Sequence, residues 1–508
     1  MASDSGATTS FWMDDGLPTF PRLDANASVD VCIIGAGIAG LSTAYQLARA
    51  GRAVLVVDDG PPGGGETGRT TSHLVTALDD RYHELERHHG KEGARLAAQS
   101  HAAAIDCIEA ICDEEHIACD FCRVHGYLFA PSENDAKDLD KELEAAHRAG
   151  LVAVQRVDRP PLSTFDLGPA LQFPRQGEIH PVRYLKGLAD ALVRRGGRIH
   201  GETHAAEIHD GHPARVVTRD GHTITASAVV VATNTPINDR VAIHTKQAAY
   251  RTFVVGMKIR RGSVPRAQFW DTLDPYHYVR IAGDLDDDHQ LLIVGGEDHK
   301  TGQANDADQR HARLAQWARE RFPVIGEPLY RWSGQVMEPI DGLAFIGLNP
   351  GDRHVYIATG DSGNGMTHGT IAGMLIADLI AGRSNPWEKL YDPSRKPLAS
   401  AGEFAKENAN VAVQFKEWLT AGDVSDIGEV RPGCGAVLRS GLHKIAVYKD
   451  DIGHVEAFDA TCPHLKCIVE WNGAERTFDC PCHGSRFDRQ GKVINGPANV
   501  DLTPVKHR

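Results

Sequence analysis

The most informative stretch of this sequence begins with Cys462-Pro-His464-Leu-Lys-Cys467 and returns at Cys480-Pro-Cys482-His483-Gly-Ser485. In it, a Cys-x-His pair is followed, after fifteen residues, by a Cys-x-x-His pair. Two thiolates suit one iron and two imidazoles suit a second, the ligand set of a Rieske-type [2Fe–2S] centre. A tetrahedral Cys2His2 zinc site would use the same side chains. Zinc would leave Cys467 and Cys482 unexplained, so the spacing favours the cluster.

About the last eighty residues resemble the Rieske family. The resemblance implies that Cys462 and Cys480 bind one iron and that His464 and His483 bind the other. It also implies a disulfide between Cys467 and Cys482 that ties the two loops. Ser485 stands where the family has a serine that donates a hydrogen bond to a bridging sulfide. Phe487 departs from the tyrosine of high-potential members, which predicts a lower reduction potential.

Length and composition bound what the remainder of the chain can be. A chain of 508 residues suits two or three domains, and 42% hydrophobic with 24% charged residues is typical of a globular protein. The net charge of −14 argues against nucleic acid or an anionic membrane as the main partner. The sequence has no apolar run long enough for a transmembrane helix, and residues 1–10 carry no signal pattern. We therefore expect a cytoplasmic chain that starts with a mobile tail.

A second motif lies near the N-terminus. An apolar run over residues 29–34 leads into Gly35-Ala-Gly37-Ile-Ala-Gly40, a helical pattern over 41–50, a second apolar run over 53–57, and Asp58. The three glycines allow a tight turn, close approach of a pyrophosphate, and close packing of helix and strand. The helix N-terminus faces the phosphates with free N–H groups, and the acid binds ribose hydroxyls. This order predicts a dinucleotide-binding unit.

Three later segments favour FAD over NAD. They are the glycine- and threonine-rich loop 63–73, the strand end at Thr233-Asn234, and the strand end at 360–367. Several strand-to-loop approaches to one ligand, spread over much of the chain, suit a long cofactor. The fingerprint occurs once, so we predict no second site for NAD(P)H.

Residues 10–390 resemble the FAD-dependent oxidoreductases of the D-amino-acid oxidase, glycine oxidase and sarcosine oxidase type. The resemblance implies an α/β Rossmann-like FAD-binding domain with an interleaved α+β substrate domain, followed here by a small all-β Rieske domain. It places the 360–367 loop over the flavin, where a helix N-terminus stabilises negative charge at N1. It implies non-covalent FAD, because the flavin-linking cysteine of sarcosine oxidase has no counterpart. The implied FAD-binding residues are Gly35, Gly37, Ile38, Ala39, Gly40, Asp58, Thr67, Arg69, Thr70, Thr233, Gly360, Gly363, Gly365, Met366 and Thr367.

The pattern of elements predicts four parts of the chain. They are an N-terminal extension (1–24), the FAD-dependent oxidoreductase (25–390), a linker with a helix (391–425) and the Rieske domain (426–508). Helices are predicted over 84–117, possibly broken, and over 133–148, 306–322 and 403–420, with another starting near residue 369. The strands 247–259, 276–281 and 290–295 are assigned to the substrate sheet. The whole order resembles bacterial fused flavin–Rieske oxidoreductases.

The simplest chemistry is oxidation of a small amine or amino acid by hydride transfer to flavin, with electrons passed singly to the cluster. An external acceptor protein or quinone would then take them, with His464 and His483 near the surface as the exit. The candidate catalytic residues are Arg69, Tyr250, Arg251 and Tyr278, in a wider pocket set with His73, His180, Arg183, Tyr276 and Arg280. Arg251 and Arg280 could bind a carboxylate as a fork, although each could instead form an ordinary salt bridge.

Two other functions remain open from the sequence. One is a redox sensor or electron-transfer module that turns over no metabolite, which an open flavin face would favour. The other is a Rieske oxygenase, which needs a mononuclear iron site of two histidines and a carboxylate, and the sequence shows no such set. Cys119-Asp-Phe-Cys122 has the Cys-x-x-Cys spacing of redox or zinc sites, but no second pair follows, so we predict structural thiols.

Overall fold

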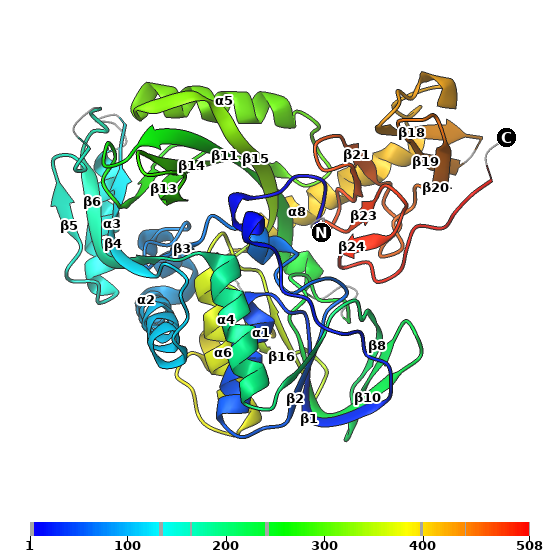
Figure 1. The fold of residues 1–508 in the computed structure, drawn as a ribbon, viewed down its shortest axis with the longest axis horizontal. Helices are drawn as coiled ribbons and strands as arrows, with labels where there is room; N and C mark the ends of the chain where they lie inside the picture. Colours follow the sequence, from blue (N-terminus) through cyan, green and yellow to red (C-terminus); the bar gives the residue numbers. More distant parts are fainter. Residues whose placement is uncertain are drawn as a thin grey trace.

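The computed structural model describes residues 5–131, 136–162, 165–238, 243–396, 400–441 and 443–506. Two large sheets form the first three quarters of the chain, and two small antiparallel sheets form the C-terminal part (Figure 1). None of the described helices is both long and apolar enough to cross a membrane.

The first sheet carries the dinucleotide fingerprint. Its main path has the order β16-β17-β10-β1-β2-β7, parallel except for β16. These strands are β1 (Ala27–Ile34), β2 (Val54–Val57), β7 (Arg198–His200), β10 (Thr223–Val231), β16 (Phe345–Leu348) and β17 (Val355–Thr359), with β8 (Ala205–His209) and β9 (Ala214–Thr218) extending it beside β10. The helices of this part are α1 (Ile38–Arg49), α2 (Tyr82–Glu115), α4 (Pro181–Arg194), α6 (Gly365–Ile380) and the short α7 (Glu388–Tyr391).

Helix α6 begins four residues earlier than the sequence pattern predicts. Its first turns contain glycines that resemble a loop in sequence. A Cβ atom at Gly369 would lie 2.7 Å from Ile38 Cγ2, and one at Gly373 would lie 2.8 Å from the Ser42 carbonyl carbon. The glycines therefore allow α6 to pack closely on α1 while its N-terminus stays at the end of β17.

The second sheet forms the interleaved domain. Its main path has the order β15-β11-β14-β13-β12-β4-β6-β3, with β5 paired to β6. Its strands are β3 (His73–Leu74), β4 (Cys122–Phe129), β5 (Gln155–Val157), β6 (Ala170–Glu178), β11 (Gln247–Arg260), β12 (Gln268–Asp271), β13 (His277–Asp284), β14 (His289–Lys300) and β15 (Val324–Pro339). Helix α5 (Ala307–Arg321) lies across β11 and β14 in Figure 1, and α3 (Ala136–Arg148) lies near β4 and β6.

The predicted break in α2 is confirmed, because Gly90 within it has the non-helical angles φ 69° and ψ 172°. The predicted mobile tail is wrong for the residues that the structure describes. Ser5 and Ser10 are buried, and the short helix η1 (Phe11–Asp15) buries Trp12 completely. The segment is held in place because it lies between the large oxidoreductase domain and the small C-terminal domain (Figure 1).

The predicted helix at 403–420 is α8 (Ala401–Gln414) followed by the 3-10 turn η5 (Phe415–Leu419), and a second turn, η6 (Ile427–Glu429), leads into the last domain. One small sheet has the order β18-β19-β20 and the other β21-β22-β23-β24. Their strands are β18 (Cys434–Ser440), β19 (His443–Lys449), β20 (Val455–Asp459), β21 (Glu470–Asn472), β22 (Thr477–Asp479), β23 (Arg486–Asp488) and β24 (Val493–Asn495). The two Cys- and His-containing loops join β20 to β21 and β22 to β23.

Candidate functional site

The fingerprint loop opens a long cavity at the carboxyl ends of the first sheet. Gly35 has φ 102° where β1 ends, and Asp58 follows the end of β2. The Asp58 carboxylate accepts hydrogen bonds from the N–H groups of Ala36 at 2.5 Å and Gly60 at 2.9 Å. Burial raises the pKa of Asp58 to about 7. This carboxylate is therefore ordered by the loop, and its position on the cavity wall fits the predicted contact with a ribose hydroxyl.

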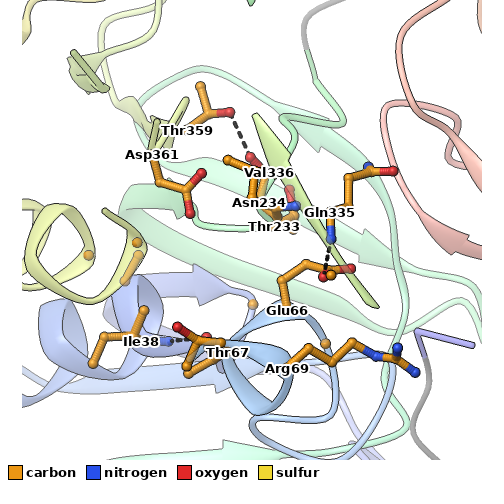
Figure 2. Close-up of a pocket in the computed structure, with 18 of the residues that line it drawn as sticks. Ile38, Glu66, Thr67, Arg69, Thr233, Asn234, Gln335, Val336, Thr359 and Asp361 are labelled. Atoms are coloured by element: carbon orange, nitrogen blue, oxygen red, sulfur yellow. Dashed lines mark hydrogen bonds between the residues drawn. The ribbon is translucent and has the colours of Figure 1, made fainter. Parts of the chain in front are cut away.

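The other predicted loops line the same cavity. Thr67 accepts a hydrogen bond from the Ile38 N–H at 3.1 Å, and Thr359 donates one to the Asn234 carbonyl at 2.6 Å (Figure 2). Most of the predicted FAD-binding residues lie on the cavity wall, namely Gly35, Gly37, Ile38, Ala39, Asp58, Thr67, Arg69, Thr70, Thr233, Gly360, Gly363, Gly365 and Met366. Gly40 and Thr367 lie behind the wall. A cavity lined by loops from β1, β2, β10 and β17 fits a long dinucleotide.

Two predicted catalytic arginines do not point into this cavity. The Arg69 guanidinium is turned away from Thr67 (Figure 2) and donates to the Ser333 carbonyl at 2.8 Å and to Glu475 at 3.1 Å. Arg251 is fully buried, with its guanidinium 3.3 Å from the same Glu475 carboxylate. As substrate-binding groups both are wrong, because the C-terminal domain supplies a buried counter-ion that holds them.

Of the other residues predicted for the pocket, some line the cavity and others have structural partners elsewhere. Arg280 donates to the carbonyls of Ser72 at 2.5 Å and Ile179 at 3.3 Å, so it holds the loop before β3 and forms no fork. Tyr250 lies outside the cavity wall, with the Lys300 ammonium 5.9 Å from its ring. Tyr278 does line the cavity, where its hydroxyl is 2.6 Å from Thr252 Oγ1. His180 and Arg183 instead lie at the start of α4 beside Asp15.

The predicted cluster ligands come together from the two loops. Cys462 and Cys480 are buried, and the rings of His464 and His483 have centroids 5.0 Å apart. Burial lowers the pKa of His483 to about 3, and its buried Nδ1 has no hydrogen-bond partner among the described residues. A neutral imidazole with a buried nitrogen lone pair, beside two cysteine thiols, fits the ligands of a [2Fe–2S] centre.

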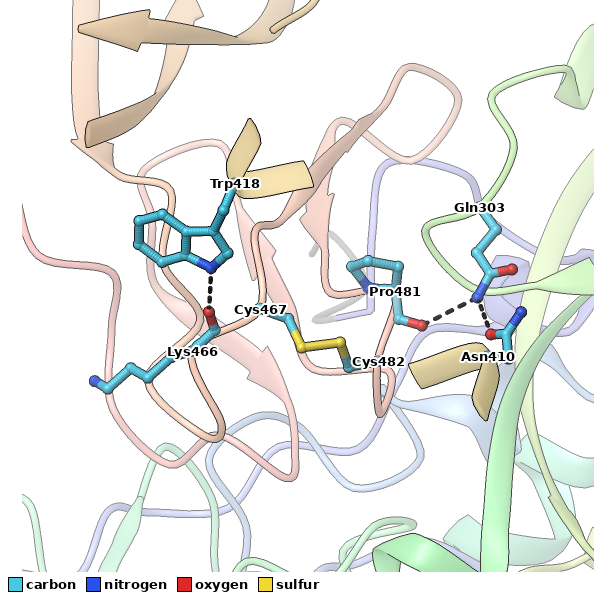
Figure 3. The surroundings of a disulfide bond; sticks show 7 residues. All are labelled: Gln303, Asn410, Trp418, Lys466, Cys467, Pro481 and Cys482. Carbon is cyan, nitrogen blue, oxygen red and sulfur yellow. Dashed lines mark hydrogen bonds between the residues drawn. A yellow bond between two sulfur atoms is a disulfide. The ribbon is translucent and has the colours of Figure 1, made fainter. Parts of the chain in front are cut away.

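A disulfide between Cys467 and Cys482 ties the two loops, which confirms the predicted pairing (Figure 3). The loops are also held from outside. Trp418 Nε1 donates to the Lys466 carbonyl at 3.0 Å, and Gln303 Nε2 donates to the Pro481 carbonyl at 3.2 Å (Figure 3). Sequence reasoning missed Gln303, because nothing in the pattern of β14 and α5 marks the turn between them as a partner of the loops.

The histidine side of the cluster faces the oxidoreductase domain. His244, buried in the turn η3 (His244–Lys246), has its ring centroid 5.0 Å from that of His464 and 6.2 Å from that of His483. Gln335 on β15 donates to the Gly484 carbonyl at 3.0 Å. The predicted surface exit through both histidines is therefore wrong, because His483 is covered by this contact, whereas His464 stays half-buried.

The dinucleotide cavity and the two-cysteine, two-histidine centre together define a flavin-linked oxidoreductase that carries a Rieske-type cluster. The family model "FAD dependent oxidoreductase" (DAO) matches residues 30–379, and the model "Rieske [2Fe-2S] domain" matches residues 417–506. The chain therefore belongs to the DAO family of FAD-dependent oxidoreductases and has a Rieske domain at its C-terminal end. It binds FAD and a [2Fe–2S] cluster, as the sequence predicts.

Three known proteins show how far the likeness extends. YhfW of Bacillus subtilis, which is named as a Rieske 2Fe-2S iron-sulfur protein, is 33% identical over 98% of this chain and 97% of its own length. Gamma-glutamylputrescine oxidoreductase of Escherichia coli is 27% identical over 75% of this chain and 90% of its own. The crystal structure of glycine oxidase from Geobacillus kaustophilus has a TM-score of 0.61 at 19% identity, covering 73% of this chain and all of that one. This last likeness concerns the fold.

Proposed function

We propose that this protein oxidises a small amine or amino acid by hydride transfer to FAD, and that the electrons pass singly through the cluster to an external acceptor protein or quinone. In this scheme FAD would supply a two-electron acceptor for the hydride, and the cluster would supply a one-electron carrier. The relative named gamma-glutamylputrescine oxidoreductase supports an amine or amino-acid-like substrate. The wall of the cavity includes residues of the N-terminal extension, the oxidoreductase domain and the Rieske domain, among them Ser5 and Asn495. A concave site built from several segments favours turnover of a metabolite over a sensor with an open flavin face.

The contact between the two domains is the observation that carries this proposal. The turn with His244 leads directly into β11, where Gln247 Nε2 donates to Thr359 Oγ1 at 3.2 Å. Thr359 and Gly360 line the FAD cavity. A ring contact at His244, the short chain segment to Gln247 and one hydrogen bond to Thr359 therefore connect the histidine side of the cluster to the wall of the flavin site, which supports direct transfer between the two centres. The half-buried loop 463–465 leaves the cluster within reach of an external acceptor.

The direct test is anaerobic mixing of the holoprotein with a panel of small amines and amino acids. We expect one substrate class to bleach the flavin absorbance first, followed by the spectral change of the reduced cluster. Stopped-flow absorbance at the flavin and cluster bands measures the two steps separately. Cluster reduction without any flavin bleaching, or no response to any amine or amino acid, would refute the proposal.

Replacing His244 with leucine should slow transfer from flavin to cluster while leaving flavin bleaching unchanged. The ring lies against both cluster histidines and outside the FAD cavity wall. We expect a loss of ~10-fold or more in the second step, the scale seen when a reacting group loses its positioning. His289→Leu, at a half-buried position where β14 begins, is the matched control. Equal rates in the two variants would show that this contact does not carry the electrons.

A further inference from the structure

The end of the cavity against the second sheet forms a box of aromatic side chains. It is lined by His73 of β3, Trp270 of β12, Tyr278 of β13, and Tyr276 immediately before β13. The ring centroids of His73 lie 6.0 Å from Trp270 and 5.7 Å from Tyr278, and those of Tyr276 and Tyr278 lie 5.6 Å apart. Indole and phenol rings expose faces of negative potential, which attract a cation enclosed between them.

One carboxylate closes this box. The Tyr276 hydroxyl donates to Asp79 Oδ2 at 3.3 Å, and Asp79 lines the same cavity beside Gly363. Burial raises the pKa of Asp79 to about 7, because the charged form loses its hydration there. An ammonium group in the box would restore the ionised form of this carboxyl group and offset the cost of burying it.

The cavity offers little to a carboxylate. Among the described residues on its wall, Arg69 is the only lysine or arginine, and Glu475 holds its guanidinium outside. Arg81, close to Asp79 in sequence, donates to the carbonyls of Leu78 at 3.4 Å and Asp271 at 3.3 Å. Burial and the charge of Arg280 lower the pKa of His73 to about 3, so its ring is neutral at physiological pH. A substrate carboxylate would meet Asp79 there, and the nearby charge of Arg81, which is not on the cavity wall, only partly offsets that of Asp79.

We infer that this box binds the ammonium group of an amine that carries no carboxylate beside it, with Asp79 as counter-ion and the rings of Trp270, Tyr276 and Tyr278 as cation–π partners. The inference rests on the proposed function and narrows its substrate class from amines or amino acids to amines. The sequence predicted an arginine fork for a substrate carboxylate, but the charged group in this part of the cavity is the Asp79 carboxylate. The site therefore favours a cationic ligand group and not an anionic one.

The test measures binding to the oxidised FAD-loaded full chain, without turnover. Tetramethylammonium and benzyltrimethylammonium are titrated against benzoate at constant ionic strength, with the visible flavin spectrum as the readout. We expect saturable spectral changes with the two cations and none with benzoate. Asp79→Asn and Trp270→Leu should each raise the dissociation constant of the cations about tenfold, and Asp79→Glu should restore part of the loss. Asp308→Asn, at an exposed position on α5, is the control.

Tyr276→Phe keeps the ring and removes only the hydroxyl, so it should keep most of the cation affinity even if the Asp79 variants lose FAD. Benzoate binding more tightly than the cations, or unchanged cation affinity in both Asp79→Asn and Trp270→Leu, would overturn the inference. The two proposals fail separately. Cation binding without flavin reduction by any amine would refute the proposed amine oxidation. Flavin reduction by amino acids without cation binding would refute the proposal that the aromatic box binds an ammonium group.

Discussion

Replacing Glu475 with glutamine is expected to lower the free energy of unfolding by about 3–5 kcal/mol, because it leaves buried guanidinium groups without their counter-ion. The Glu475 carboxylate is fully buried between Arg69 at 3.1 Å and Arg251 at 3.3 Å. It also accepts hydrogen bonds from Thr8 Oγ1 at 2.6 Å and from Ser333 Oγ. Burial already lowers the pKa of Arg251 to about 10, so this charge depends on its partner.

The measurement is denaturant unfolding of the holoprotein, combined with limited proteolysis of the linker between the two domains. Glu320→Gln, which removes a carboxylate from the exposed end of α5, should change stability by less than about 0.5 kcal/mol. Because Glu475 joins the N-terminal segment, the oxidoreductase domain and the Rieske domain, the linker should also become easier to cleave. Equal stability of the two variants would show that the buried charges are compensated in another way.

The same carboxylate predicts a pH dependence of stability. The charges of Arg69 and Arg251 outweigh burial and hold the pKa of Glu475 far below its ordinary value. A group with a lowered folded-state pKa contributes stability above its unfolded pKa, and that contribution is lost as the pH falls. The wild-type protein should therefore lose stability below about pH 4.5, the ordinary pKa of glutamate, more steeply than Glu475→Gln.

Cys480→Ser should abolish the cluster while leaving FAD bound. Cys480 is a buried, predicted ligand on the β22–β23 loop, and an alcohol is a poor substitute for a thiolate at iron. Iron and sulfide content should fall close to zero, and substrate should still bleach the flavin, because most of the wall of its cavity belongs to the oxidoreductase domain. Transfer to an external one-electron acceptor should be lost, because the scheme routes it through the cluster.

Cys434→Ser is the matched control, because Cys434 is a half-buried thiol on β18 that is not among the four ligands. It should keep full iron and sulfide content and an unchanged electron paramagnetic resonance signal after reduction. A Cys480→Ser protein with the same signal would contradict the ligand assignment. Loss of flavin from Cys480→Ser but not from Cys434→Ser would instead show that the loaded Rieske domain is needed to close the FAD cavity.

Both cofactor sites were predictable because each depends on short-range chemistry. The run from β1 through Gly35 and α1 to Asp58 combines apolar strands with glycines at fixed spacing, and only a few structures satisfy that pattern. The cluster loops are similarly constrained, since two thiols and two imidazoles must reach one small centre. The disulfide between Cys467 and Cys482 was expected from the resemblance to the Rieske family, and the structure contains it.

Only the tertiary structure determined which residues from distant parts of the chain surround these two sites. Arg69 and Glu475 are 406 residues apart, and Asp79 and Tyr276 are 197 apart, so no local pattern relates either pair. The contact of His244 with the two cluster histidines likewise exists only because the domains dock. Charged side chains are versatile, and an arginine that suits a substrate carboxylate suits a buried glutamate equally well. Which partner it has depends on how distant segments pack, and here that packing removes the arginines from the cavity and leaves Asp79 in it.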